Sequence, residues 1–182
     1  MKASVYIATS LDGFIARENG DLDWLPGADG ETQADGETPD FGFNAFMDSV
    51  DVLVMGRKTY EKVLAFGEWP YGKTRVMVLS SSLKTIPENL SGSVEIASGS
   101  PQEIYSRLAE ENAQHLYFDG GATIQGFLAA KLITDVIITI VPVLIGKGIP
   151  LFGPLTEDIK LKHTSTQSFG NGFVQSSYEV LP

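Results

Sequence analysis

One stretch of the sequence, residues 52–61, constrains the fold more than any other. It reads Val-Leu-Val-Met-Gly-Arg-Lys-Thr-Tyr-Glu, an apolar run that ends at Gly56 and continues into the start of a helix. Short apolar runs bounded by turn residues are typical of buried strands. A strand that leads directly into a helix predicts an α/β protein, in which ligands bind at the carboxyl ends of the strands.

The rest of the chain repeats this alternation of strands and helices. We expect two last strands, at 161–166 and 172–180, to pair antiparallel because no helix separates them. The sequence therefore predicts an α/β fold with a mostly parallel central sheet, flanking helices and an antiparallel carboxyl-terminal edge. Without a linker or a repeat, we expect one domain over residues 1–182. The other expected strands are 4–9, 51–55, 74–79, 94–97, 115–118 and 135–144, and the expected helices are 41–49, 59–64, one opened by Pro101 and one over 124–132.

Composition excludes several classes of function. The net charge of −10 argues against nucleic acid and anionic membranes as partners, because both need a basic surface. There is no cysteine, and the two histidines are isolated, so we expect no metal site. We expect His115 at a strand edge and His163 in solvent. The amino terminus starts directly in a strand pattern and no apolar run approaches the roughly 20 residues that span a bilayer, which predicts a cytoplasmic protein.

Three expected strands end in residues that suit phosphate groups. The three segments are Gly56-Arg57-Lys58-Thr59, Ser80-Ser81-Ser82 and Gly120-Gly121-Ala122-Thr123. Each one alone is more often an ordinary turn. Parallel strands end at the same edge of a sheet, so together the three turns predict an extended ligand with several phosphates. A G-x-G-x-x-G motif after the first strand and a Walker P-loop are both missing, which argues against a Rossmann site and a P-loop NTPase.

The side chains offer few parts for acid–base or nucleophilic catalysis. There is no Gly-x-Ser-x-Gly elbow, and Asp12, Asp29, Asp40 and Glu61 suit acid–base work only where they are buried. Asp40 also precedes the helix expected at 41–49, where a carboxylate can cap it. Hydride transfer from a nicotinamide needs few side chains because the cofactor carries the chemistry.

Three segments of the chain resemble a known family. These are Ser10-Leu11-Asp12-Gly13-x-Ile15-Ala16, then MGRKTYE at 55–61 and the long segment at 119–152. They resemble the dihydrofolate reductase-like superfamily and, within it, the reductase domain of riboflavin biosynthesis, the RibD C-terminal type. The resemblance implies the dihydrofolate reductase-like fold, and it spans nearly the whole chain in the right order.

The resemblance also implies NADPH as the cofactor. Ala8 and Thr9 would meet the nicotinamide amide, and Arg57 or Lys58 would suit the adenosine 2′-phosphate. Ile15 and Trp24 would belong to a loop that closes over the nicotinamide, although from the sequence Trp24 is equally suited to pinning that loop. The family is usually dimeric, which implies a homodimer through the carboxyl-terminal strands. The other implied cofactor contacts are Gly56 and Thr59 at the phosphates, Ser80 and Ser81 along the adenosine half, and Gly120, Gly121, Ala122 and Thr123 under the pyrophosphate.

The departures from the family concern the substrate. The acidic residue that meets the pterin in dihydrofolate reductase corresponds to Asp40 when counted from Arg57, and to Asp29 when counted from Trp24. Residues 60–67 lack the Asp-Asp-Pro and the arginine of riboflavin-pathway reductases, and there is no deaminase zinc signature. We expect an NADPH-dependent reductase of a small pyrimidine- or pterin-like heterocycle, similar to 5-amino-6-(5-phosphoribosylamino)uracil reductase, with Asp40 as the candidate catalytic residue. The alternatives are a dihydrofolate reductase and a non-catalytic NADP-binding dimer.

Overall fold

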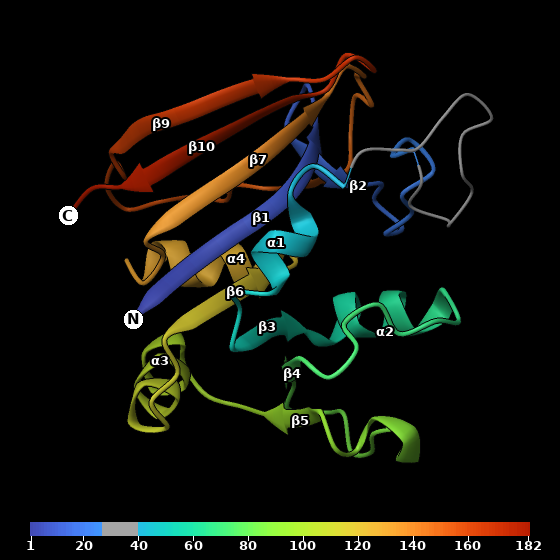
Figure 1. Ribbon diagram of the computed structural model, residues 1–182, viewed down its shortest axis with the longest axis vertical. Coiled ribbons are helices and arrows are strands. Elements are labelled where there is room, and N and C mark those ends of the chain that lie inside the picture. The colour runs from blue at the N-terminus through green and yellow to red at the C-terminus, as the bar shows by residue number, and fades with distance from the viewer. Residues whose placement is uncertain (27–39) are drawn as a thin grey trace.

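The computed structural model describes residues 1–26 and 40–182, and the elements in this part of the chain alternate as expected (Figure 1). The expected loop over residues 17–40 therefore lies mostly outside the described residues, as does Asp29. The elements are β1 (Lys2–Ser10), β2 (Phe14–Ala16), α1 (Phe43–Met47), β3 (Val52–Gly56), α2 (Arg57–Ala65), β4 (Arg75–Leu79), the 3₁₀ helix η1 (Glu88–Leu90), β5 (Val94–Ala97), α3 (Pro101–Glu110), β6 (His115–Asp119), α4 (Gly121–Ala129), β7 (Asp135–Val141), β8 (Ile149–Pro150), β9 (Leu161–Ser168) and β10 (Val174–Val180).

One eight-stranded sheet has the order β5-β4-β3-β6-β1-β7-β10-β9. Neighbouring strands from β5 to β7 are parallel, whereas β10 is antiparallel to both β7 and β9. The predicted mostly parallel sheet with an antiparallel carboxyl-terminal edge is therefore confirmed. A second pair, β2 with β8, was not expected, because strands of three and two residues are too short to show a periodic pattern.

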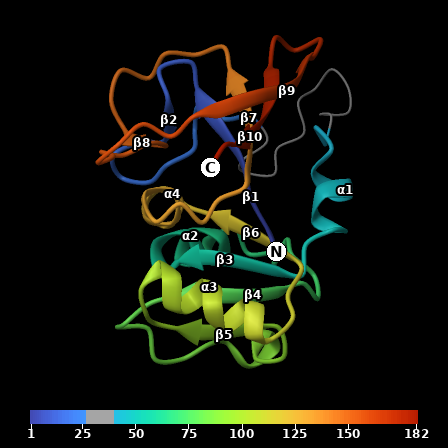
Figure 2. The ribbon, with the colours of Figure 1, turned by 90° about the vertical axis from the view of Figure 1, so that its left-hand side faces the viewer.

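The central strands are apolar throughout because both faces of the sheet are covered. In β3, Val52 and Val54 belong to a core that also contains residues of α3 and α4, whereas Leu53 and Met55 belong to a core with residues of α1 and α2. Figure 1 shows α1 in front of the sheet, and Figure 2 shows α3 lying across the β3–β4–β5 half. Helices therefore cover both faces of the central sheet.

Local chemistry explains where several elements begin and end. Ser100 and Glu103 form a complete capping box at the start of α3, with Pro101 in the first turn as expected. Helix α1 is shorter than the predicted 41–49, because Phe41 and Gly42 have φ angles of 54° and 85°, which a right-handed helix does not accept. Strand β7 ends just before Pro142, which has no N–H to donate. Within the described residues, no helix is long and apolar enough to cross a membrane.

Candidate functional site

The three turns expected to bind phosphate lie at one edge of the sheet. Strands β4, β3 and β6 are neighbours and parallel, so their carboxyl ends are adjacent. The turns at residues 56–59, 80–82 and 120–123 follow these three strands directly. The expected convergence is therefore confirmed, and we call these three turns the strand-end site.

Two glycines allow the turns after β3 and β6 to touch. A Cβ atom at Gly56 would lie 3.2 Å from Thr123 Oγ1, and a Cβ atom at Gly120 would overlap the Thr59 hydroxyl. Gly120 also has a φ of 89°, a conformation that other residues rarely adopt. The contact places the first turn of α2 against the first turn of α4.

The amino ends of α2 and α4 are suited to an anion. In the part of the chain that the structure describes, neither helix has a side chain that caps its first N–H groups. These groups have no partner inside the helix, and the helix dipole adds partial positive charge there. Arg57 and Lys58 are exposed on the first turn of α2. Arg57 lies 3.7 Å from Glu61, but these side chains are 43% and 49% exposed, so this ion pair is weak and easily exchanged for a ligand.

The remaining cofactor candidates surround this contact. A Cβ atom at Gly121 would lie 3.0 Å from Ile15 Cδ1 and 3.2 Å from Ile149 Cγ2, so the small β2–β8 sheet rests against the start of α4. Ala122 is exposed and Thr123 is buried. Ser80 Oγ accepts hydrogen bonds from the N–H groups of residues 82 and 83, at 3.1 and 2.9 Å, and so shapes its turn, whereas Ser81 is exposed.

Ala8 and Thr9 lie in β1 beyond the point where its pairing with β6 ends. The pairing of β1 with β6 runs only to Val5 and Phe118, whereas its pairing with β7 continues to Ser10. In the described sheet, the backbone of residues 8 and 9 is therefore outside the ladder on the β6 side. This arrangement agrees with the expectation that backbone groups here meet a ligand.

Asp40 is placed as a helix cap. Its two carboxylate oxygens accept hydrogen bonds from the N–H groups of Gly42 and Asn44, at 2.9 and 3.2 Å. These bonds favour the ionised form and lower the pKa of the exposed Asp40 carboxyl. Asp40 is therefore better suited to accepting hydrogen bonds than to donating a proton near neutral pH.

Sequence reasoning did not assign a role to Asp119, although it precedes the Gly-Gly turn directly. Burial raises the pKa of Asp119 to about 6, against the lowering effect of a hydrogen bond from Gly120 N at 2.8 Å. The pKa values of Tyr71 and Tyr117 are raised first by burial and then by the negative charge of Asp119. Asp119 is thus a carboxyl group at the strand-end site that can exchange a proton near neutral pH. The signal in the sequence was an acidic residue at the end of an apolar strand.

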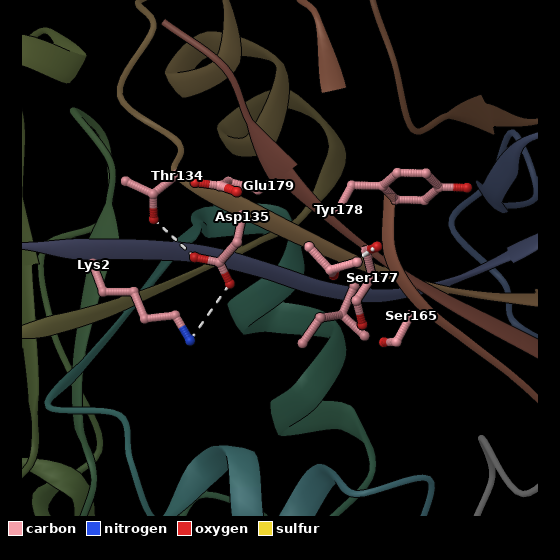
Figure 3. Close-up of a pocket in the computed structure, with 9 residues that line it drawn as sticks. Lys2, Thr134, Asp135, Ser165, Ser177, Tyr178 and Glu179 are labelled. Atoms are coloured by element: carbon pink, nitrogen blue, oxygen red, sulfur yellow. Dashed lines mark hydrogen bonds and ion pairs between the residues drawn. The ribbon is translucent and has the colours of Figure 1, made fainter. Parts of the chain in front are cut away.

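Two surface hollows lie away from these turns. One of about 500 Å³ is bordered by Lys2, Asp135 and Tyr178, towards the opposite end of β1 and β7 (Figure 3). Another of about 370 Å³ lies beside residues 17–23 and Lys147. Neither hollow is lined by residues of the strand-end site. The features that suit the strand-end site to a ligand are its uncapped backbone N–H groups and its glycine contacts, not a deep cavity.

Comparisons with known proteins agree with this architecture. The model of the RibD C-terminal domain family matches residues 2–175. The chain belongs to this family. One relative, YwjB of Bacillus subtilis, an uncharacterized protein, is 35% identical over 179 residues, which are 97% of each chain. A crystal structure of a putative riboflavin biosynthesis protein from Shewanella sp. PV-4 is 38% identical, with a TM-score of 0.89 and coverage of 100% of both chains.

A second solved structure supports the fold alone. It is a diaminohydroxyphosphoribosylaminopyrimidine deaminase/5-amino-6-(5-phosphoribosylamino)uracil reductase from Thermotoga maritima, with a TM-score of 0.72 and 15% identity. The likeness covers 99% of the present chain and 56% of that one. The RibD C-terminal match includes all three turns of the strand-end site and Asp119, so the site lies within the shared domain.

Proposed function

We propose that this protein is a cytoplasmic NADPH-dependent reductase that transfers a hydride to a small heterocycle of the pyrimidine or pterin type. The observation that carries the proposal is the contact between the uncapped amino ends of α2 and α4 at Gly56 and Gly120. Membership of the RibD C-terminal domain family supports the class of oxidoreductase.

The residues present fit a dinucleotide phosphate. The N–H groups at the starts of α2 and α4 would hold the pyrophosphate, because two helix dipoles meet there. Arg57 or Lys58 would bind the 2′-phosphate, since both are charged and exposed. Ser81 and the turn shaped by Ser80 would lie along the adenosine half. Residues 8 and 9 would meet the nicotinamide amide, with Ile15 beside it.

Bound NADPH supplies the hydride, and the protein supplies orientation and a proton. We assign the proton to the Asp119 carboxyl, whose pKa of about 6 leaves about a tenth of the groups protonated at pH 7. A general acid works best when its pKa lies near the working pH. Asp40 is the alternative anchor for the substrate, as an ionised acceptor of hydrogen bonds.

Cofactor binding is the first test of this function. Titration of NADPH against the fluorescence of Trp24 and Trp69, with a thermal shift in parallel, should show saturable binding; ligand at 100 times its Kd adds about 2.7 kcal/mol to stability. Arg57→Ala should weaken NADPH at least tenfold and NADH much less. Lys160→Ala, at an exposed lysine outside the strand-end site, is the control. Absence of NADPH binding to the wild-type protein would refute the proposal.

A substrate panel separates the remaining alternatives. Oxidation of NADPH with pyrimidine or pterin substrates other than dihydrofolate supports the proposed class. Turnover of dihydrofolate that collapses in Asp40→Asn supports a dihydrofolate reductase. Binding of NADPH without oxidation across pterins, pyrimidines, quinones and aldehydes supports a non-catalytic binding protein.

We also propose that two copies of the chain form a homodimer through the carboxyl-terminal strands. All eight residues of β9 are exposed, although β9 is a regular strand of the sheet. The hollow of about 500 Å³ lies on the same part of the molecule, where Ser165 and Ser177 face each other across β9 and β10 (Figure 3). An exposed edge strand with an open face is a surface that a second chain can cover.

A further inference from the structure

A buried network of hydrogen-bonded side chains connects the amino ends of β1, β6 and β7, outside the strand-end site. Ser4 and His115 are 0% and 6% exposed. Ser4 Oγ lies 2.8 Å from His115 Nε2 and 2.7 Å from Asp135 Oδ1. On its other side, His115 Nδ1 lies 3.0 Å from the carbonyl oxygen of Ser49. The expectation that His115 sits at a strand edge misses this network, because its partners come from β1, β7 and the segment after α1.

The number of available hydrogens allows this hydrogen-bonded network two arrangements. The Ser49 carbonyl can only accept, and the Ser49 hydroxyl, 3.1 Å from Nδ1, donates its hydrogen to the Phe46 carbonyl at 2.6 Å, so His115 Nδ1 carries a hydrogen. The Asp135 carboxylate can also only accept, and the Ser4 hydroxyl has one hydrogen to donate. With a neutral imidazole, Ser4 can therefore donate to His115 Nε2 or to Asp135, but not to both. When His115 takes up a second proton, Nε2 donates to Ser4 Oγ and the Ser4 hydroxyl donates to Asp135.

The charged groups around His115 act in both directions. Burial lowers the pKa of His115 most, and the charge of Lys2 lowers it further, whereas the Ser49 carbonyl, Asp135 and Asp51 raise it. Lys2 Nζ lies 3.6 Å from Asp135 Oδ1, and Asp51 Oδ2 accepts a hydrogen bond from the His115 backbone N–H at 2.8 Å. The lowered pKa keeps the imidazole neutral at pH 7.

Two further elements at this end of the sheet place a charged residue beside Asp135 and an aromatic ring beside His115. Glu179 of β10 is the partner of Asp135 across the sheet, and the Phe46 ring of α1 meets the imidazole edge-on, with a centroid distance of 5.5 Å. Asp135 and Lys2 also border the hollow in Figure 3. The buried proton site is thus one hydroxyl away from a solvent-accessible carboxylate.

We propose that Ser4 is a hydroxyl switch that couples the protonation of buried His115 to Asp135 in the wall of the hollow. In the neutral state, the Ser4 hydroxyl points to His115 and Asp135 depends on Thr134 and Lys2, which lie 2.8 and 3.6 Å from its oxygens. In the protonated state, the hydroxyl turns to Asp135. The hydrogen bonding of Asp135 in the wall of the hollow then follows the protonation of His115 without a change of backbone.

The test is an NMR titration of the two histidines, His115 and His163, with ¹⁵N-labelled imidazoles in the full chain. At pH 7, His115 should be neutral with its hydrogen on Nδ1. Ser4→Ala should lower the titration midpoint of His115 by about one pH unit, because the charged imidazole loses a stronger hydrogen bond than the neutral one. Ser165→Ala, in the wall of the same hollow, is the matched control and should leave the midpoint unchanged.

A second variant keeps the proposal testable if Ser4→Ala folds poorly. Asp135→Asn should also lower the midpoint of His115, and this effect should shrink in the Ser4→Ala background if the coupling passes through the hydroxyl. A hydrogen on Nε2 at pH 7 would overturn the proposal. So would an unchanged midpoint in Ser4→Ala, or equal effects of Asp135→Asn with and without Ser4.

Discussion

At the scale of single residues, Gly120 has less room for a Cβ atom than Gly56 or Gly121, the other two glycines of the strand-end site. Gly120→Ala should lower the free energy of unfolding by about 1–3 kcal/mol, because the backbone has a φ of 89° and the new Cβ would overlap the Thr59 hydroxyl. NADPH affinity should fall as well, since the two helix ends must separate. Gly170→Ala, at a glycine with open space around its Cβ position, is the control for chemical denaturation and should change little. Equal stability of both variants would contradict the tight contact.

Ionisation of Asp119 should lower the free energy of unfolding. Burial raises its pKa from 3.8 to about 6, so the folded state is penalised once the carboxyl ionises, and this penalty grows as the pH rises from about 4 to about 6. Asp119→Asn should therefore raise the free energy of unfolding at pH 7 by about 1–3 kcal/mol and leave it nearly unchanged at pH 4. Denaturant titrations at the two pH values measure this difference. A gain of the same size at pH 4 would mean that ionisation is not the cause.

The same carboxyl should shape the pH profile of turnover. The protonated fraction of Asp119 falls as the pH rises through about 6, so kcat for the proposed reduction should decline above that pH. Asp119→Asn should be much slower and lack this limb of the profile. An unchanged limb in the variant would assign the proton to another group.

At the scale of elements, four charged side chains tie the end of α3 to β4 and to the edge strand β5. Arg75 and Arg107 each contact both Glu95 and Glu111, at distances from 2.5 to 2.9 Å. Glu111→Gln removes two of these contacts and should lower the free energy of unfolding by about 0.5–1 kcal/mol at low salt, and by less at 0.5 M salt. Glu157→Gln breaks a single pair whose side chains are 63% and 62% exposed, and should have no measurable effect. Thermal melts at two salt concentrations compare the variants.

The elements that could be predicted are those with a strong local signal. The apolar run at Val52–Gly56 and the Ser100-Pro101 helix start depend on side chains close in sequence, and both are confirmed. The pairing of β2 with β8 could not be predicted, because it joins short segments that lie more than 130 residues apart.

The candidate site was predictable only in part, for the same reason. The shared edge of the three turns follows from the parallel direction of their strands, which the alternation of strands and helices predicts, whereas the order of the strands was not predicted. The burial that makes Asp119 a weak acid, and the partners of His115, depend on tertiary contacts that no single stretch reveals.

At the scale of the whole molecule, the net charge of −10 and the exposed strand β9 constrain the proposed homodimer. Lys162 of β9 forms an ion pair with Glu179 of β10, and a bulge at Ser177–Tyr178 interrupts the pairing of β10 with β9. A charged side chain and a bulge both discourage uncontrolled pairing of the edge strand with another chain. A specific dimer must therefore use the open face of β9 and β10 rather than simply extend the sheet. Ser165 lies on that face, beside Ser177.

This geometry gives a test of the proposed homodimer. In a symmetric interface, Ser165→Glu would add two negative charges to an acidic assembly and bury them unpaired, so the dimer should dissociate. Light scattering at micromolar concentration should give twice the mass of 19.7 kDa for the wild type and the single mass for the variant. Ser91→Glu, at an exposed serine after η1, adds the same charge elsewhere and should leave the dimer intact. A monomeric wild type, or a Ser165→Glu protein that stays dimeric, would remove this face as the interface, and NADPH binding measured on the same samples would show whether the strand-end site depends on it.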